Sequence, residues 1–159
     1  MQPLHRLTLS VFADYHQFYI WDPVLSGQIA PDDYTDADIA NRVKIAEGVV
    51  VVQPVRNMTV PVEVSIWPAE PDVHYADWQH CATAPLKVQS GQIQIHECTG
   101  SALADISVPS GHYIVRCLFR GLDTLSPNGL DGQDFYSIQL WPGHSSALTV
   151  IKAWAEPSA

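Results

Sequence analysis

The sequence is poor in basic residues and lacks the signature motifs of common enzymes. Its 159 residues include 8 Lys and Arg against 17 Asp and Glu, which gives a formal net charge of −9. A protein that binds nucleic acid by neutralising phosphates needs the opposite balance, so we expect no direct nucleic-acid binding. No Walker A, GxGxxG, HExxH or GxSxG sequence occurs. We therefore expect a non-enzymatic protein that carries no cofactor.

Cysteines and long apolar runs are also scarce. Cys81, Cys98 and Cys117 are widely spaced and form no CxxC pair, so neither a disulfide framework nor a zinc knuckle is predicted. The longest apolar run, at 48–52 (GVVVV), is far too short to span a bilayer. The N-terminal residues show no signal-peptide pattern. We expect a cytoplasmic protein that does not contact a membrane.

Short alternating segments are abundant. Twelve prolines and nine glycines separate runs in which apolar and polar residues alternate, which is the period of a half-buried strand. About nine or ten such runs predict an all-β fold, an antiparallel β-sandwich formed by residues 1–159 as a single domain. The inward faces that this period predicts are Val60, Val62, Val64 and Ile66; Ile93 and Ile95; Tyr113, Val115, Cys117 and Phe119; and Tyr136, Ile138 and Leu140.

One segment departs from this period and predicts a helix of about three turns. Thr35 is placed as its N-cap, with Asp36 and Asp38 in the first turn, where carboxylates suit the helix dipole. Gly48 is placed to end the helix. The apolar stripe consists of Ile39, Val43 and Ala46.

The aromatic segment 14–22 (DYHQFYIWD) is predicted to be one strand. Period two puts His16 on the inward face with Phe18 and Ile20, so we expect a hydrogen-bonded core histidine and not a catalytic one. The opposite face carries Tyr15, Gln17, Tyr19 and Trp21. These aromatics are either an exposed contact surface or are covered by another part of the chain.

Two polar loops are candidate ligand sites. Residues 121–134 (GLDTLSPNGLDGQD) include Asp123, Asn128, Asp131 and Asp134, so this loop is either an acidic interaction surface or a calcium site. Residues 74–81 (HYADWQHC) have no recognised ligand spacing, so no metal site is predicted there. Arg56 is a candidate buried partner for one of the acids.

Several short motifs, in order along most of the chain, resemble the competence protein J family. They are DYHQF at 14–18, YTDADI at 34–39, GVVVVQPVRN at 48–57 and VPSGHYIVRC at 108–117. The resemblance implies a bacterial β-sandwich that inhibits a DNA-entry nuclease of competence and has no enzymatic activity of its own. The loop at 121–132 (GLDTLSPNGLDG) and the LWPG at 140–143 depart from the family pattern.

The acidic charge and the resemblance predict the same kind of function. An inhibitor that occupies a basic DNA-binding cleft presents carboxylates where phosphates would lie, and aromatic residues serve as anchors. We expect a basic protein partner such as a nuclease. The predicted partner-binding residues are Tyr15, Tyr19, Trp21, Asp32, Asp33, Asp36, Asp123, Asp131 and Asp134.

Three further possibilities stay open at the level of sequence. One is an enzyme whose dispersed site no local motif reveals. The sandwich could bind a ligand, either calcium or a carbohydrate stacked on Trp67, Trp78 or Trp141. A free edge strand could also pair two copies of the chain into a homodimer.

Overall fold

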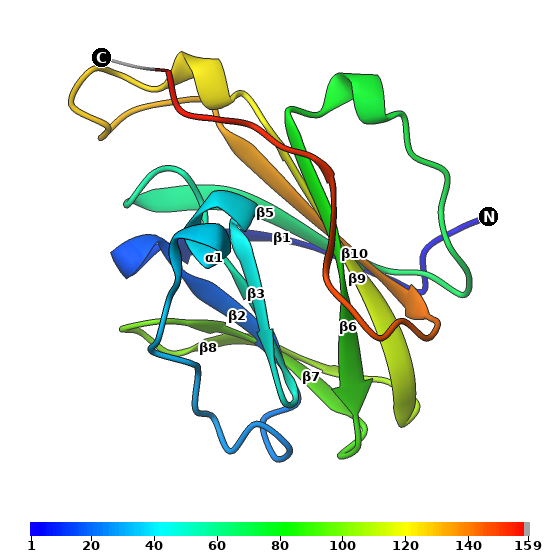
Figure 1. The fold of residues 1–159 in the computed structure, drawn as a ribbon. Helices are drawn as coiled ribbons and strands as arrows, with labels where there is room; N and C mark the ends of the chain where they lie inside the picture. Colours follow the sequence, from blue (N-terminus) through cyan, green and yellow to red (C-terminus); the bar gives the residue numbers. More distant parts are fainter. Residues whose placement is uncertain (158–159) are drawn as a thin grey trace.

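The computed structural model describes residues 1–157 as two β-sheets packed face to face, with one short helix at one end (Figure 1). Sheet A has six strands in the order β1 (His5–Phe12), β5 (Thr59–Ile66), β10 (Phe135–Pro142), β9 (Gly111–Arg120), β6 (His80–Val88) and β11 (Thr149–Lys152). Sheet B has five strands in the order β3 (Val43–Ala46), β4 (Val49–Val52), β2 (Phe18–Trp21), β7 (Gln92–Glu97) and β8 (Ala102–Ser107). The predicted β-sandwich is confirmed, with eleven strands.

Sheet A is mixed, which corrects the prediction of purely antiparallel pairing. β5 pairs with β1 in antiparallel orientation but with β10 in parallel orientation, with Val64 opposite Ile138. Parallel neighbours need a long connection. Here the chain passes through β6, β7, β8 and β9 after β5. It then forms β10, which lies between β5 and β9 in the sheet. Alternation within a strand does not encode this order.

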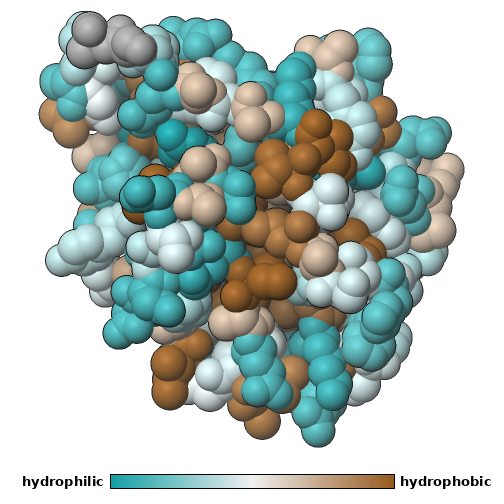
Figure 2. Space-filling model, in the orientation of Figure 1, coloured by the Kyte–Doolittle hydropathy of each residue, from teal (hydrophilic) through white to brown (hydrophobic). Residues whose placement is uncertain are grey.

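The core lies between the sheets and follows the predicted alternation. All the residues predicted to face inward on β5, β7, β9 and β10 are buried in one apolar cluster, together with Phe18 and Ile20 of β2. Half-buried apolar residues such as Ile45 of β3 and Val150 of β11 pack against this cluster. Figure 2 shows hydrophobic side chains gathered along the middle of the face seen in Figure 1, with hydrophilic residues around them.

The helix begins as predicted but is shorter. α1 (Asp36–Asn41) starts with a capping box, in which the Thr35 hydroxyl accepts from Asp38 N–H and the Asp38 carboxylate accepts from Thr35 N–H. It ends at Arg42, whose φ of 58° is left-handed. The three-turn prediction is therefore wrong.

The second half of the predicted helix is a strand. Val43 is buried in β3, which pairs with the valine-rich β4 across a hairpin that turns at Gly48. Gly48 has a φ of +72°, which glycine adopts without a steric cost. β-Branched residues gain more by pairing with β4 than by extending a six-residue helix. Ile39, the remaining member of the expected stripe, is exposed.

The aromatic segment is a turn followed by a strand. Asp14–His16 form the 3₁₀ turn η1, and β2 starts only at Phe18. His16 is exposed, and its Nδ1 lies 3.1 Å from the carbonyl oxygen of Pro54. The core position predicted for His16 is wrong, because the turn breaks the period before the strand begins. Two further 3₁₀ turns are η2 (Tyr75–Asp77) and η3 (Leu122–Thr124). Across residues 1–157, no helix has the length and apolarity to cross a membrane.

Candidate functional site

The outer face of sheet B carries a second, smaller apolar cluster. Tyr19 and Trp21 of β2 stack at 5.0 Å between ring centroids and lie beside Val49 and Val51 of β4. The segment 28–34 crosses above them, and its Ala30 and Tyr34 pack against the cluster. Tyr19 and Trp21 are therefore 6% and 2% exposed. They occupy the predicted face of the strand, and of the two alternatives left open by the sequence, the covered one is found, so these two rings are not an exposed contact surface.

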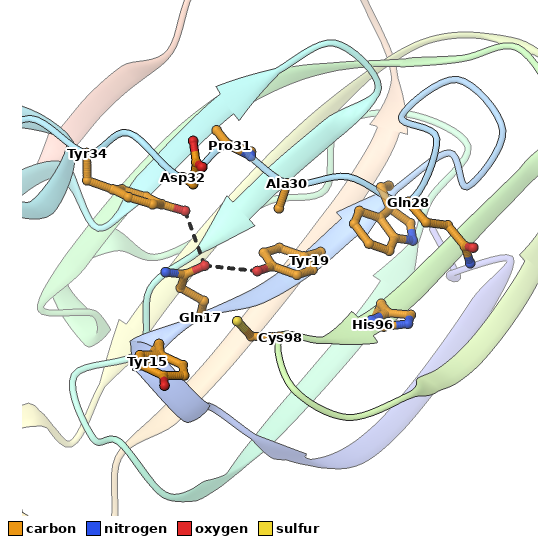
Figure 3. A pocket seen from close by; sticks show the side chains of 11 residues that line it. Tyr15, Gln17, Tyr19, Gln28, Ala30, Pro31, Asp32, Tyr34, His96 and Cys98 are labelled. Atoms are coloured by element: carbon orange, nitrogen blue, oxygen red, sulfur yellow. Dashed lines mark hydrogen bonds between the residues drawn. The ribbon is translucent and has the colours of Figure 1, made fainter.

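A cleft of about 360 Å³ remains between this covering segment and the sheet (Figure 3). Segment 28–34 forms one wall, and His96 and Cys98, at the end of β7, form the other. Tyr15 and Tyr34 stand on opposite sides of one mouth, with Gln17 between them. We call this the Tyr15–Tyr34 cleft. Its lining residues are Tyr15, Gln17, Tyr19, Trp21, Gln28, Ala30, Pro31, Asp32, Tyr34, His96 and Cys98.

Two phenols meet on one amide inside this cleft. The hydroxyl groups of Tyr19 and Tyr34 donate to Oε1 of Gln17 at 2.9 and 3.2 Å (Figure 3). Burial, followed by the nearby Cys98 thiol and acidic side chains, raises the pKa of Tyr34 to about 12. Burial and the Cys98 thiol also raise the pKa of Tyr19. Both phenols therefore keep their protons and act as donors to Gln17 at neutral pH.

Tyr15 is an exposed aromatic residue on a fixed turn. Its side chain is 68% exposed, and its backbone is left-handed with φ of 57°. Asp14 holds the turn, because its carboxylate accepts from Tyr15 N–H at 3.1 Å and from the Thr99 hydroxyl at 2.9 Å. His16, also left-handed, donates its N–H to the carbonyl of Ala13. Two consecutive left-handed residues other than glycine are costly, and such strain is concentrated at functional sites.

The first group of predicted acids lies beside this cleft. Asp32 lines it, and Asp33 and Asp36 follow along the same segment, all three exposed. Asp38 differs, because it bonds Nζ of Lys44 at 2.6 Å. That hydrogen bond, followed by the one from Thr35 N–H, lowers the pKa of the Asp38 carboxyl. Among residues 1–157, the three predicted aspartates take part in no salt bridge, so they carry the unpaired negative charge of this region.

The second group, in the loop at 121–134, is divided. Asp123 and Asp131 are exposed. Asp134 is fully buried and accepts from Nε of Arg56 at 2.8 Å. The surface role predicted for Asp134 is therefore wrong, whereas the expected pairing of Arg56 with one of the acids is confirmed. The carboxylate of Asp134 also accepts from the Tyr136 hydroxyl at 2.6 Å.

The two acidic groups lie at the same end of the sandwich, on which η1, α1 and the loop between η3 and β10 are all found (Figure 1). A chain of contacts connects them. The imidazole of His80 lies 2.7 Å from the carbonyl of Asn41 in α1 and accepts from Trp154 N–H. The indole of Trp154 in turn bonds Asp123 at 3.4 Å. We call this surface the acidic end; it consists of Tyr15, Asp32, Asp33, Asp36, Asp123 and Asp131.

The geometry does not support the two ligand sites considered from sequence. The oxygens of the loop at 121–134 point to different partners, since Asp123 accepts from Gln79, Asn128 from Ser126, and Asp134 from Arg56. Within residues 1–157, no three His, Cys, Asp or Glu side chains converge as metal ligands would. His80 is buried on β6, away from the polar loop in which it was expected.

Each tryptophan considered for carbohydrate stacking already makes a cation–π contact with an arginine of the same chain. Arg6 lies 5.8 Å from the ring of Trp67, Arg116 lies 4.8 Å from Trp141, and Arg120 lies 4.9 Å from Trp78. Trp141 is also 6% exposed. These rings therefore take part in internal cation–π contacts.

Sequence analysis missed several residues of the cleft. The period of β2 puts Gln17 on the face of Tyr19, but Tyr34 comes from the covering segment, and His96 and Cys98 lie about 80 positions further along the chain, at the end of β7 and just after it. One local signal existed for Tyr34, which follows two aspartates just before a helix start and is the only aromatic residue of that segment. No local pattern links it to Gln17.

The fold and this surface define a class, an all-β sandwich with exposed acidic and aromatic residues gathered at one end. The chain belongs to the competence protein J (ComJ) family, whose model matches residues 10–140. The crystal structure of ComJ from Bacillus subtilis, described as an inhibitor of the DNA-degrading activity of NucA, is similar with a TM-score of 0.64 and 21% identity, over 89% of this chain and 98% of that one. The product of crocagin biosynthetic gene J is similar with a TM-score of 0.55 and 18% identity, over 87% and 96%. Both likenesses concern the fold. Comparison of the sequence with curated proteins gives no match.

Proposed function

We propose that this protein is a non-enzymatic protein-binding module that inhibits a basic bacterial nuclease of the DNA-entry type. The observation that carries the proposal is the acidic end, where the exposed residues Tyr15 and Asp32 line opposite sides of one cleft. Family membership supports it, because the Bacillus subtilis relative is described as an inhibitor of NucA.

Electrostatics explains why this surface suits such a partner. A nuclease binds DNA through positive charge that faces the phosphates, and a protein with a net charge of −9 is attracted to the same charge. Five exposed aspartates of the acidic end place negative charge on both sides of the contact chain through Trp154. Complementary potentials speed encounter, while a rigid aromatic anchor slows dissociation.

The test is a DNase assay with purified NucA and with the nuclease activity of a lysate from the source bacterium. We expect DNA cleavage to fall as the protein is added, with an end point at a fixed ratio of protein to nuclease. Inhibition should weaken as salt rises, because screening removes the electrostatic attraction. Full cleavage by both nucleases in the presence of excess protein at low salt would reject the proposal.

A mobility-shift experiment with the same DNA and no nuclease separates inhibition from substrate capture. We expect no shift, because an acidic protein has no charge with which to neutralise phosphates. A shift at the concentration that inhibits cleavage would mean that the protein hides the DNA and does not block the enzyme.

A further inference from the structure

We infer that the Tyr15–Tyr34 cleft is a receptor for one arginine side chain of the partner protein. This inference deepens the proposed function and rests on it, since it names the chemical group that a basic partner inserts into the acidic end. The cleft is open beside Tyr15 and is lined by aromatic rings and acceptor atoms.

The rings provide the first argument. Tyr15 and Tyr34 flank one mouth, and Tyr19 lies between the covering segment and the sheet (Figure 3). Aromatic faces attract cations within about 6 Å of their centroids. The protein already uses one of these rings in that way, because Nζ of Lys44 lies 5.3 Å from the centroid of Tyr34.

Hydrogen bonding provides the second argument. Each phenol carries one proton, and the hydroxyl groups of Tyr19 and Tyr34 both donate that proton to Gln17. Their oxygens can therefore only accept from a ligand. Nδ1 of His96 lies 2.6 Å from the Glu97 carbonyl, so this nitrogen carries a proton and donates it within the chain. The cleft thus favours a ligand with several donors.

Charge provides the third argument. Asp32 is one of the lining residues, and Asp33 follows it on the exposed segment. None of the eleven lining residues is a lysine or an arginine. A guanidinium group is flat, always charged and has five N–H donors, so it can lie against a ring while it bonds several acceptors. A lysine ammonium has three donors around a point and stacks less well.

The test is a titration of the isotope-labelled protein followed by NMR, with the peptide acetyl-Gly-Arg-Gly-amide as the probe. The matched control is the same peptide with citrulline, which keeps the shape of arginine but removes its charge. We expect the arginine peptide to shift the amide signals of Gln17, Tyr34 and Cys98 in a saturable manner, with a Kd on the order of 1 to 10 mM. The citrulline peptide should bind at least fivefold more weakly.

Variants assign the effect to the cleft. Tyr15→Asn removes the ring but keeps a residue that tolerates the left-handed backbone, and we expect about fivefold weaker binding. Tyr15→Phe keeps the ring and should bind the peptide as the wild type does. Asp32→Asn should also weaken binding, whereas Asp72→Asn, at an exposed acid outside the cleft, should not.

Three results would overturn the inference: equal binding of the citrulline and arginine peptides, shifts that map outside the cleft, or wild-type binding by Tyr15→Asn. The titration needs no nuclease, so its failure is distinct from a failure of the proposed function. A protein that inhibits the nuclease but ignores the peptide would bind its partner through the acidic end without an inserted arginine.

Discussion

The carboxylate of Asp134 accepts a hydrogen bond from Nε of Arg56 at 2.8 Å across 78 positions of sequence. The pair joins the turn after β4 to the end of the loop at 121–134. Arg56 also donates from its guanidinium to the carbonyl of Leu130 at 3.2 Å, so it holds the loop at two points. The turn itself reaches η1, where Nδ1 of His16 lies 3.1 Å from the carbonyl of Pro54. One buried ion pair therefore connects both halves of the acidic end.

Removal of the Asp134 carboxylate should destabilise the folded protein. Asp134→Ala leaves the Arg56 guanidinium and the Tyr136 hydroxyl without their buried acceptor, so we expect the free energy of unfolding to fall by about 3 kcal/mol. Urea denaturation measures the change. Asp131→Ala, in the same loop but exposed, should change it by less than about 0.5 kcal/mol. Equal effects of the two substitutions would contradict this account.

The exposed aspartates should control the rate of association. In Asp32→Asn/Asp33→Asn, we expect association with the nuclease to slow by about threefold to tenfold at low salt. The difference should vanish near about 0.5 M salt, where the Debye length is short. Stopped-flow or biosensor kinetics provides the rates. Glu47→Gln/Asp72→Asn removes the same charge from exposed positions outside the acidic end, and a similar slowing there would assign the effect to net charge alone.

His80 should make stability depend on pH. Burial, followed by the charge of Arg42, lowers its pKa below the ordinary value of 6.5, although the hydrogen bond to Asn41 opposes this. The folded protein then binds fewer protons than the unfolded chain. Stability is therefore complete above about pH 6.5 and falls, by up to about 1.4 kcal/mol per unit, as the pH drops from 6.5 to the folded pKa.

Urea denaturation across this range checks the slope. The backbone N–H of Trp154 now donates to Nδ1 of His80. Protonation would put an N–H on Nδ1, facing the N–H of Trp154, and this explains the loss of stability in structural terms. We expect His80→Gln to flatten the dependence, whereas His74→Gln, at an exposed histidine, should leave it unchanged. A wild-type slope in His80→Gln would assign the dependence to another group.

Asp22 should support the fold down to low pH. Its buried carboxylate accepts four backbone N–H bonds, from Val24, Leu25, Gln89 and Ser90. Burial alone raises its pKa, but the bonds led by Ser90 outweigh burial and lower it to about 2. Because the folded pKa is below the unfolded value of 3.8, this stabilisation is present above 3.8 and is lost as the pH falls from 3.8 to about 2.

The substitution Asp22→Ala leaves these four N–H donors without their acceptor, and we expect the free energy of unfolding to fall by about 3 kcal/mol at neutral pH. Denaturation at neutral and acidic pH measures both effects. The variant should also lack the part of the acid transition that the wild type shows between about pH 4 and pH 2. Asp72→Ala, at an exposed acid, is the control, and an equal loss there would contradict the prediction.

The sequence predicts the strands well because alternation is a local consequence of burial on one face. The inward positions of β5, β7, β9 and β10 follow from it directly. The helix start at Thr35 is equally local, because a capping box involves residues only three positions apart. The end of the helix is not decided locally, because Val43 becomes part of a strand by pairing with β4.

The site shows the same division. Tyr15, Asp32, Asp33, Asp36, Asp123 and Asp131 are exposed, as a contact surface requires. Tyr19 and Trp21 look equally available in sequence, but segment 28–34 covers them. Asp134 resembles the other loop acids in sequence and differs only because Arg56 lies next to it in space.

Sequence by itself determined the fold class, the two-sided strands, the acidic charge and the family resemblance, because each depends on composition or on neighbours a few positions apart. Tertiary structure alone decided which strands pair, which acids are buried and that a cleft forms between Tyr15 and Tyr34. Those features depend on contacts between segments tens of positions apart, such as Arg56 with Asp134 and segment 28–34 with β2. Their energies are set by burial and by partners that local periodicity does not encode.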